Sequence, residues 1–174
     1  MRVMGIVGRS GSGKTTLIER LLPLLRAQGV SVSTMKHTHH GVDLDRPGKD
    51  SFRHRTAGAH EVMLVSDQRW VLMHEDTAPH DGPRDILPLL ARLAPVDLVL
   101  VEGFHASTPA ALEVWRPETG KPALFADQPT ILAVATPPGA TLPPRICAPA
   151  PPEQIDLNDE PSIAAFILAH ARSL

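Results

Sequence analysis

The spacing of apolar positions changes from strand-like to helix-like near the start of the chain. The run from Val3 to Val7 predicts a buried strand over 2–7. Leucines at 17, 21, 24 and 25 recur with helical spacing and predict a helix over about 13–28, which contains Pro23. Gly29 ends that helix, and alternation over 30–35 predicts a second strand. The opening segment therefore reads as strand, glycine-rich turn, helix and strand.

The remaining elements continue this alternation, with one insertion. Glu61–Val65 and Trp70–His74 predict a β-hairpin that turns at 66–69. Further strands are expected at 97–101, 111–115 and 131–134, and helices at about 50–56, 83–93 and from 158–160 onward. Seven prolines between Pro137 and Pro152 predict an irregular segment, with room for a short edge strand at 145–147. The pattern predicts an α/β fold, a mostly parallel sheet with helices on both faces and an inserted hairpin.

Composition narrows the class of protein. A chain of 174 residues fits one domain, and we expect 1–174 to form a single nucleotide-binding domain. A net charge of −2 argues against a general nucleic-acid binder. The single Cys147 excludes an internal disulfide and a multi-cysteine zinc site. No apolar run approaches a membrane span, and a strand begins within a few residues of Met1. We expect a cytoplasmic protein without a signal peptide, bound neither to nucleic acid nor to membrane.

The turn between the first strand and helix carries the strongest chemical signal. Residues 8–15 fit G-x-x-x-x-G-K-[ST], the phosphate-binding P-loop, at each fixed position. Glycines let backbone N–H groups approach a phosphate, and the following helix adds free N–H donors. Lys14 is expected to reach the β- and γ-phosphates, and the Thr15 hydroxyl to bind Mg²⁺. The predicted nucleotide-binding residues here are Gly8, Ser10, Gly11, Ser12, Gly13, Lys14, Thr15 and Thr16.

A second signal lies at the end of the strand at 97–101. This strand runs directly into Glu102-Gly103-Phe104. Ligands of open α/β sheets bind at the carboxyl ends of the strands. Glu102 is therefore predicted to position Mg²⁺, directly or through water. Lys14 and Glu102 are the two expected catalytic residues.

Three blocks together resemble one family. They are the P-loop GRSGSGKTT, the block KHTHHGVDLDRPGKDSFRHRTAGA from Lys36 to Ala59, and LVEGF from Leu100 to Phe104. P-loop proteins in general do not share the middle block. With IDLND before the last helix, the chain is similar to the molybdopterin-guanine dinucleotide biosynthesis protein B family, MobB, along nearly its whole length.

The resemblance implies a function that composition and spacing alone do not. Such proteins bind GTP with Mg²⁺, hydrolyse it weakly and tend to form homodimers. They assist a guanylyltransferase that joins GMP to molybdopterin, which gives molybdopterin guanine dinucleotide. The expected partners are therefore GTP, molybdopterin or its guanine dinucleotide, the molybdenum cofactor guanylyltransferase and a second copy of the chain.

The block at 36–59 concentrates basic and histidine side chains and permits three interpretations. One is a metal site at His37, His39 and His40, with His54 as a fourth ligand. Another is a set of solvated side chains at a strand end and on a helix face. The favoured interpretation is anion binding, either to the pterin phosphate or to a neighbouring subunit's nucleotide. The cofactor-binding candidates of this block are Lys36, His37, Lys49 and Arg53, beside Arg55.

The acidic residues of the same block offer a further metal ligand. Related GTPases place an acidic residue beyond the second strand to hold Mg²⁺ or orient water. Asp43 and Asp45 are the preferred candidates, with Asp50 as a third.

The chain departs from the family pattern at two places. His105 follows E-G-F where relatives often carry a basic residue, and Ala135-Thr136-Pro137-Pro138 lacks the carboxylate that suits guanine recognition. No Asn-Lys-x-Asp signature occurs, so the guanine preference rests on the resemblance alone. A P-loop small-molecule kinase or ligase and a metallochaperone GTPase remain alternatives to a slow GTPase that acts as an adaptor.

Overall fold

The structure is a computed structural model that describes residues 1–38, 41–42, 44–76, 85–104, 107–148 and 150–173. It divides into two compact units, one of residues 1–37 with 84–174 and one of residues 38–83. The P-loop sequence lies in the first, larger unit. That residues 1–174 act as one domain stays a prediction.

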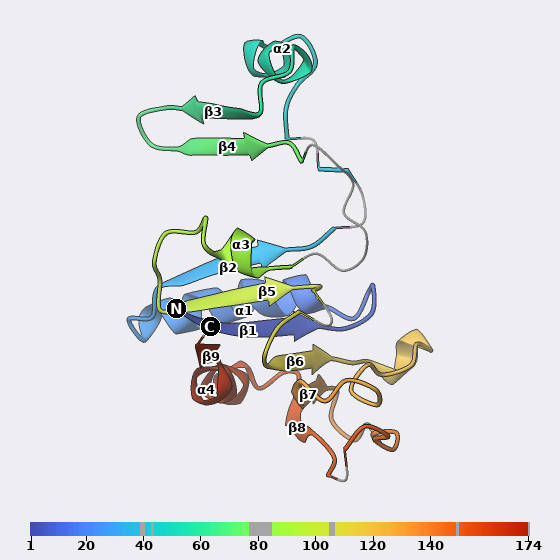
Figure 1. Cartoon of the computed structure of the whole chain (residues 1–174). Coiled ribbons are helices and arrows are strands. Elements are labelled where there is room, and N and C mark those ends of the chain that lie inside the picture. The colour runs from blue at the N-terminus through green and yellow to red at the C-terminus, as the bar shows by residue number, and fades with distance from the viewer. Residues whose placement is uncertain (39–40, 43, 77–84, 105–106, 149, 174) are drawn as a thin grey trace. The chain divides into compact units, whose positions relative to one another are not determined.

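The larger unit is built on a parallel sheet with the order β2-β5-β1-β6-β7-β8 (Figure 1). Its long apolar strands are buried because the sheet is covered on both faces. The short β9 pairs antiparallel with β1. The strands are β1 (Arg2–Val7), β2 (Val32–Lys36), β5 (Leu98–Glu102), β6 (Ala111–Val114), β7 (Ile131–Thr136), β8 (Glu153–Asp156) and β9 (Arg172–Ser173).

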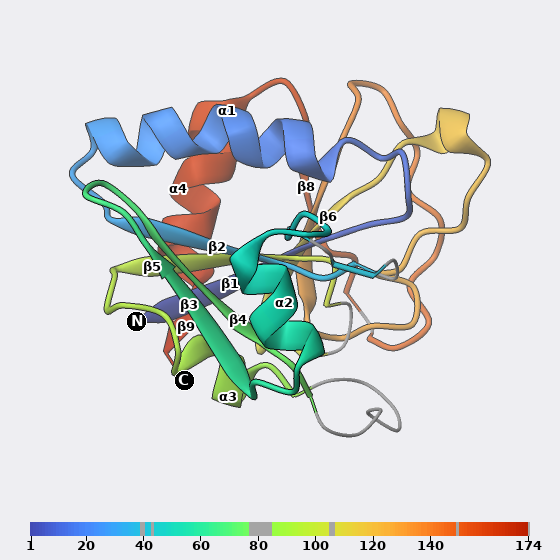
Figure 2. The same ribbon diagram turned by 90° about the horizontal axis from the view of Figure 1, so that it is seen from above.

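Helices cover both faces of this sheet. α1 (Lys14–Ala27) and α4 (Glu160–His170) contact each other and share one core cluster with alternate side chains of the strands (Figure 2). The short α3 (Leu87–Leu90) packs on the other face, in a cluster with Val3, Val99 and Phe104. A single 3-10 turn, η1 (Pro117–Thr119), follows β6. The predicted fold class, an α/β P-loop NTPase-like fold, is confirmed.

The smaller unit consists of α2 (Asp50–Thr56) and the antiparallel pair β3 (Glu61–Val65) and β4 (Trp70–His74). The hairpin was predicted with these bounds. Val62 is buried, whereas Met63 and Val65 on the opposite face are exposed, as is Trp70, which pairs with Val65. A two-stranded sheet is marginally stable by itself.

Two expectations about elements were wrong. Residues 145–147 form no strand, because the N–H groups of Ile146 and Cys147 both donate to the Ala126 carbonyl at 3.0 and 3.1 Å. The edge strand is instead β8, which pairs with β7. The helix expected at 83–93 spans only Leu87–Leu90, with Pro88 in its first turn, where a proline's missing N–H costs little. Pro83 lies outside the described residues.

Other bounds differ by one or two residues, and α1 runs through Pro23 without interruption. The predicted cap of the last helix is confirmed, because the Asp159 carboxylate accepts a hydrogen bond from the Ser162 N–H at 3.1 Å. Among the described residues, no helix combines the length and the apolar character that crossing a bilayer requires.

Candidate functional site

The loop between β1 and α1 has the backbone conformation that its glycines predict. Gly8, Gly11 and Gly13 have φ angles of 141°, 85° and 100°. A side chain at Gly8 would collide with the Val114 carbonyl of the neighbouring strand β6. α1 begins at Lys14, so its unpaired N–H groups face the loop. This arrangement offers a concave set of donors to an anion.

The carbonyl groups of the loop are held by cationic side chains. The Lys14 ammonium donates to the carbonyls of Gly8 and Arg9 at 2.9 and 3.1 Å. Lys121 donates to the Ser10 carbonyl at 2.8 Å, and the Arg116 Nε donates to the Ser12 carbonyl at 3.0 Å. Binding of these carbonyls fixes the orientation of the peptide groups whose N–H dipoles would meet a phosphate.

Thr15 and Glu102 contact each other beside the loop. β5 lies directly beside β1, with Glu102 in register with Ile6. The Thr15 hydroxyl donates to Glu102 Oε1 at 2.8 Å. The Lys36 ammonium, at the end of β2 on the other side of β5, lies 3.3 Å from both Glu102 Oε1 and Thr15 Oγ1. Three residues remote in sequence thus form one polar cluster beside the loop.

Burial and the neighbouring charges shift the pKa of Lys14. Partial burial lowers the pKa of Lys14 below its ordinary value of 10.5. The Glu102 carboxylate opposes this shift, whereas the positive charges of Lys36 and Lys121 add to it. A bound phosphate would stabilise the charged ammonium and reverse the shift.

Arg116 and Lys121 were missed by sequence reasoning. Both lie in the segment after β6, more than 100 residues beyond the loop that they contact. The one available signal concerned Arg116, which directly follows the predicted strand at 111–115 as Glu102 follows the strand at 97–101. That signal carries meaning only once β6 is known to lie beside β1.

The segment that carries these two residues is itself anchored. The buried Glu113 carboxylate accepts hydrogen bonds from the N–H groups of Leu124, at 2.8 and 3.0 Å, and Phe125, at 2.8 Å. The indole Nε1 of Trp115 donates to the Lys121 carbonyl at 3.2 Å. Burial raises the pKa of Glu113 above its ordinary 4.5, and the hydrogen bonds from Leu124 and Phe125 oppose this rise. Glu113 therefore holds the loop that brings Lys121 to the P-loop.

The other predicted residues fall into three groups. His37 lies in the larger unit, where its N–H donates to the Glu102 carbonyl at 2.9 Å and its ring lies 4.8 Å from that of Phe104. Of the P-loop residues, Ser12 has a buried hydroxyl without a hydrogen-bond partner among the described residues, and Ser10 and Thr16 are exposed.

The second group lies in the smaller unit. The Asp45 carboxylate accepts hydrogen bonds from the Ser51 hydroxyl at 2.7 Å and the Arg46 N–H at 3.0 Å. Arg53 forms an exposed ion pair with Asp50 at 3.7 Å, and Lys49 precedes the first turn of α2. Their proposed binding roles stay predictions.

The third group, His39, His40, Asp43 and His105, lies outside the described residues. Within the described ranges, no group of three or more His, Cys, Asp or Glu side chains is arranged to hold a metal ion.

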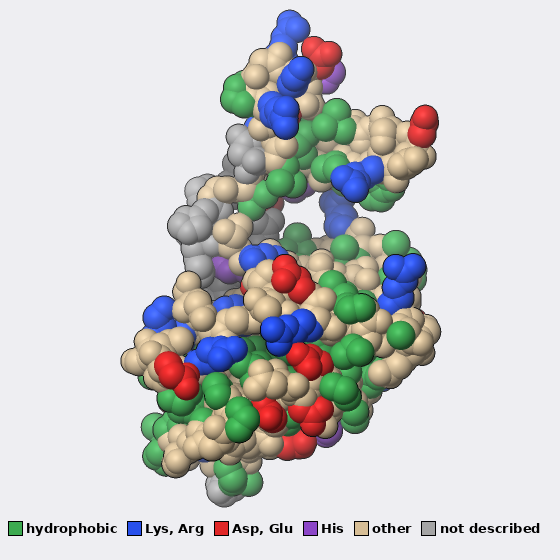
Figure 3. Space-filling model, turned by 180° about the vertical axis from the view of Figure 1, so that it is seen from behind, with side chains coloured by type: hydrophobic (Ala, Val, Ile, Leu, Met, Phe, Trp, Pro, Cys, Tyr) green, Lys and Arg blue, Asp and Glu red, His purple; other side chains and the backbone are tan. Residues whose placement is uncertain are grey.

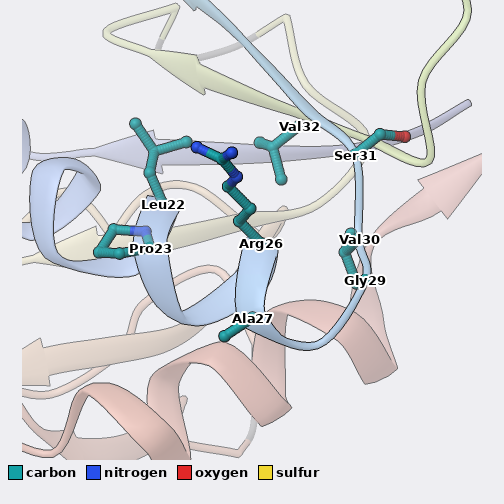
Figure 4. A pocket seen from close by; sticks show the side chains of 8 residues that line it. All are labelled: Leu22, Pro23, Arg26, Ala27, Gly29, Val30, Ser31 and Val32. Atoms are coloured by element: carbon teal, nitrogen blue, oxygen red, sulfur yellow. The ribbon is translucent and has the colours of Figure 1, made fainter.

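A hollow of about 930 Å³ lies at the far end of α1 from the loop (Figure 4). Its lining is mostly apolar, and Arg26 is its one charged side chain among those drawn. The lining residues are Leu22, Pro23, Arg26, Ala27, Gly29, Val30, Ser31 and Val32. Because this hollow lies near the amino ends of the strands, the opposite side from ligand sites in such sheets, we place no chemistry there.

The fold and the glycine loop between β1 and α1 define an α/β protein of the P-loop NTPase-like class. A solved structure described as molybdopterin-guanine biosynthesis protein B is similar, with a TM-score of 0.69 and 27% identity over 96% of this chain and 98% of that one. The family model for MobB, "Molybdopterin guanine dinucleotide synthesis protein B", matches residues 3–137. The chain belongs to the MobB family.

Two relatives extend this similarity over nearly the whole chain. Both are named molybdopterin-guanine dinucleotide biosynthesis adapter protein. The protein of Haemophilus influenzae is 41% identical over 165 residues, 95% of this chain and 86% of the relative. That of Escherichia coli is 36% identical over 162 residues, 91% of this chain and 87% of the relative. The resemblance seen in the sequence is thus confirmed.

Proposed function

We propose that this protein is an adapter in the synthesis of molybdopterin guanine dinucleotide, and that it binds GTP with Mg²⁺ at the loop between β1 and α1. Membership of the MobB family and the names of the relatives support a role of this protein in that synthesis. The proposed partners are molybdopterin or its guanine dinucleotide and the guanylyltransferase that acts on them. A cytoplasmic location remains a prediction of the sequence.

One observation carries the nucleotide part of the proposal. The Thr15 hydroxyl at the start of α1 lies 2.8 Å from Glu102 Oε1 at the end of the adjacent strand. A hydroxyl and a carboxylate are oxygen ligands of the kind that Mg²⁺ prefers. These two oxygens already contact one cation, the Lys36 ammonium, which lies 3.3 Å from each of them. The donor set fits Mg²⁺, which would be held by Thr15 and Glu102 and would neutralise phosphate charge when bound.

The chain's own groups account for the remaining chemistry. The loop N–H groups bind the β-phosphate, and Lys14 neutralises charge that builds up on the γ-phosphate during attack by water. When the nucleotide binds, the Lys36 ammonium leaves its ion pair with Glu102 and binds a phosphate oxygen instead. In the described chain, the side-chain contacts of Glu102 include no arginine or glutamine. Slow turnover is therefore expected.

The smaller unit suits contact with further partners. Lys49 and Arg53 present positive charge on and beside α2, and we propose that they bind the pterin phosphate or a neighbouring subunit's nucleotide. Met63, Val65 and Trp70 expose apolar area on one face of the hairpin, and Figure 3 shows hydrophobic side chains at the surface of this unit. A second copy of the chain covering that face would give the proposed homodimer.

Calorimetric titration tests the nucleotide claim, with GTP and ATP compared in the presence and absence of Mg²⁺. We expect GTP to bind more tightly than ATP, and Mg²⁺ to strengthen binding. Addition of the chain to the guanylyltransferase, molybdopterin and GTP tests the adapter claim, with the rate of dinucleotide formation as the readout. Unchanged rates, together with unaltered dinucleotide-cofactor content in cells lacking the protein, would remove the adapter claim.

A further inference from the structure

Arg116 is the half-buried cation that lies against the start of α1. Its Nε donates to the Ser12 carbonyl at 3.0 Å. A Cβ placed on Gly13 would lie 3.7 Å from that Nε and 3.8 Å from Nη2. The backbone of Arg116 is fixed in turn, because its carbonyl accepts hydrogen bonds from the Thr119 N–H at 3.1 Å and the Thr119 hydroxyl at 2.8 Å. Arg116 is therefore held against the loop by its Nε at one end and by its backbone carbonyl at the other.

The sheet order places Arg116 and Glu102 on opposite sides of the loop. β1, which leads into the loop, lies between β5, which ends at Glu102, and β6, which precedes Arg116. Thr15 and Glu102 would hold Mg²⁺ on the β5 side of the loop, where the ion would neutralise phosphate charge. The γ-phosphate of a nucleotide bound at the loop would then lie on this side. The α-phosphate, on the other side of the β-phosphate, would lie toward Arg116.

A small cavity marks this second side. It measures about 30 Å³ and is lined by Gly13, Thr16, Leu17, Arg20, Arg116 and Leu157. Arg20 forms an ion pair with Glu160 at 3.1 Å. In the part of the chain that the structure describes, the Nη atoms of Arg116 have no hydrogen-bond or ion-pair partner. An arginine fork with free terminal donors is the group that binds phosphate oxygens with two hydrogen bonds.

We propose that Arg116 binds a non-bridging oxygen of the α-phosphate of the nucleotide held at the loop. The assignment rests on the proposed function, and it adds a residue on the nucleoside side that complements Lys14 on the β- and γ-phosphates. GDP and GTP share the α-phosphate, so Arg116 contributes equally to the binding of both. A residue at the γ-phosphate would instead favour GTP.

The first test compares Arg116→Gln with wild type by calorimetric titration of GTP and GDP in Mg²⁺. Loss of a charge-assisted contact weakens binding by about 10- to 100-fold, and we expect the same factor for both nucleotides. Arg26→Gln is the matched control, because it removes an arginine at the far end of α1. Arg116→Lys retains the charge but not the two parallel donors of the guanidinium. Its nucleotide affinity is expected to lie between those of wild type and Arg116→Gln.

A second readout separates phosphate contact from support of the loop. Each diastereomer of GDP with sulfur on the α-phosphate is compared with GDP, and GDP with sulfur on the β-phosphate serves as reference. Wild type should bind one α-thio diastereomer less tightly than GDP, and Arg116→Gln should lose that difference while retaining the β-thio effect. A residue that only supports the loop would leave the α-thio difference intact.

The outcomes decide between the two levels of the proposal. If wild type binds neither GTP nor GDP, the proposed function fails and the assignment with it. If wild type binds both nucleotides, three results would each overturn the Arg116 assignment and leave the proposed function intact. The first is that Arg116→Gln binds GTP and GDP as tightly as Arg26→Gln does. The others are a loss of affinity for GTP only and an α-thio difference that Arg116→Gln leaves unchanged. Thermal unfolding without nucleotide confirms that each variant is folded. If Arg116→Gln does not fold, Arg116→Lys takes its place in both tests.

Discussion

Two buried glutamates flank the strand that leads into the P-loop, and they have opposite surroundings. Glu102 of β5 is in register with Ile6 of β1, and Glu113 of β6 is in register with Val7. Their exposed fractions are 8% and 0%. The Glu102 carboxylate contacts the Thr15 hydroxyl and the Lys36 ammonium, whereas the Glu113 carboxylate accepts backbone N–H groups.

The difference lies in whether the partners can be exchanged. A hydroxyl and a long flexible ammonium can turn toward a ligand, so Glu102 can accept a metal ion in their place. The N–H groups of Leu124 and Phe125 cannot turn away without rearrangement of the segment that carries them. Burial of an acid therefore marks a binding role only when its partners can be exchanged.

Glu113→Ala should give the largest effect, and it should be on stability. The substitution leaves two buried N–H groups unpaired, which costs about 2 to 6 kcal/mol in the free energy of unfolding. Urea unfolding measures this loss. Glu102→Gln should change the same free energy by less than about 1 kcal/mol, because its Lys36 partner is exposed. Equal losses for the two variants would abolish the distinction.

Glu102→Gln should act on Mg²⁺-dependent binding instead. We expect the gain in GTP affinity that Mg²⁺ gives to fall by about 10- to 100-fold, equivalent to about 1.4 to 2.8 kcal/mol. Without Mg²⁺, GTP should bind the variant at least as tightly as wild type, because a negative charge near the phosphates is gone. Titration with and without Mg²⁺ measures both quantities. An unchanged Mg²⁺ effect would remove Glu102 from the metal site.

A third difference concerns pH. Burial raises the pKa of Glu113, so between 4.5 and its raised pKa the folded chain holds a proton that the unfolded chain has released. The free energy of unfolding should therefore fall as pH rises through this window, by at most about 1.4 kcal/mol per pH unit from this group. Subtraction of the Glu113→Gln profile isolates the contribution. A difference that rises with pH would contradict the assignment.

The smallest expected effect is on Lys14. Glu102 raises the pKa of Lys14 against the lowering by burial, and Glu113 has no such influence. Glu102→Gln should therefore lower the pKa of Lys14 further, whereas Glu113→Gln should leave it near the wild-type value. The Lys14 Cε chemical shift, followed through an alkaline titration, reports the pKa. Equal shifts in both variants would show that the two carboxylates are not distinct in their action on the loop.

The sequence predicts the local parts of this account well. The P-loop, the strand ending at Glu102 and the hairpin at 61–74 each depend on residues close together in the chain, where spacing reveals the structure. β8 was missed because its four residues include three polar side chains and follow a proline-rich segment. The helix at 83–93 was overestimated because its leucines fit the period, although Pro88 permits only the turn that follows it.

The two sides of the loop could not be predicted because they depend on strand order. β5, β1 and β6 are neighbours in space but are far apart in the sequence. Glu113 appeared only as a polar residue within a predicted strand, and Arg116 only as a residue after one. Their contacts with Leu124, Phe125 and Ser12 arise from tertiary packing, which periodicity does not encode.

A crystal structure with Mg²⁺ and a non-hydrolysable GTP analogue tests the central claim most directly. We expect a metal ion about 2.1 Å from Thr15 Oγ1, with Glu102 as its ligand directly or through water. Lys36 should have left Glu102 for a phosphate oxygen, while Glu113 keeps its hydrogen bonds to Leu124 and Phe125. A nucleotide bound away from the loop, or a metal ion without Thr15 and Glu102 in its surroundings, would contradict the account.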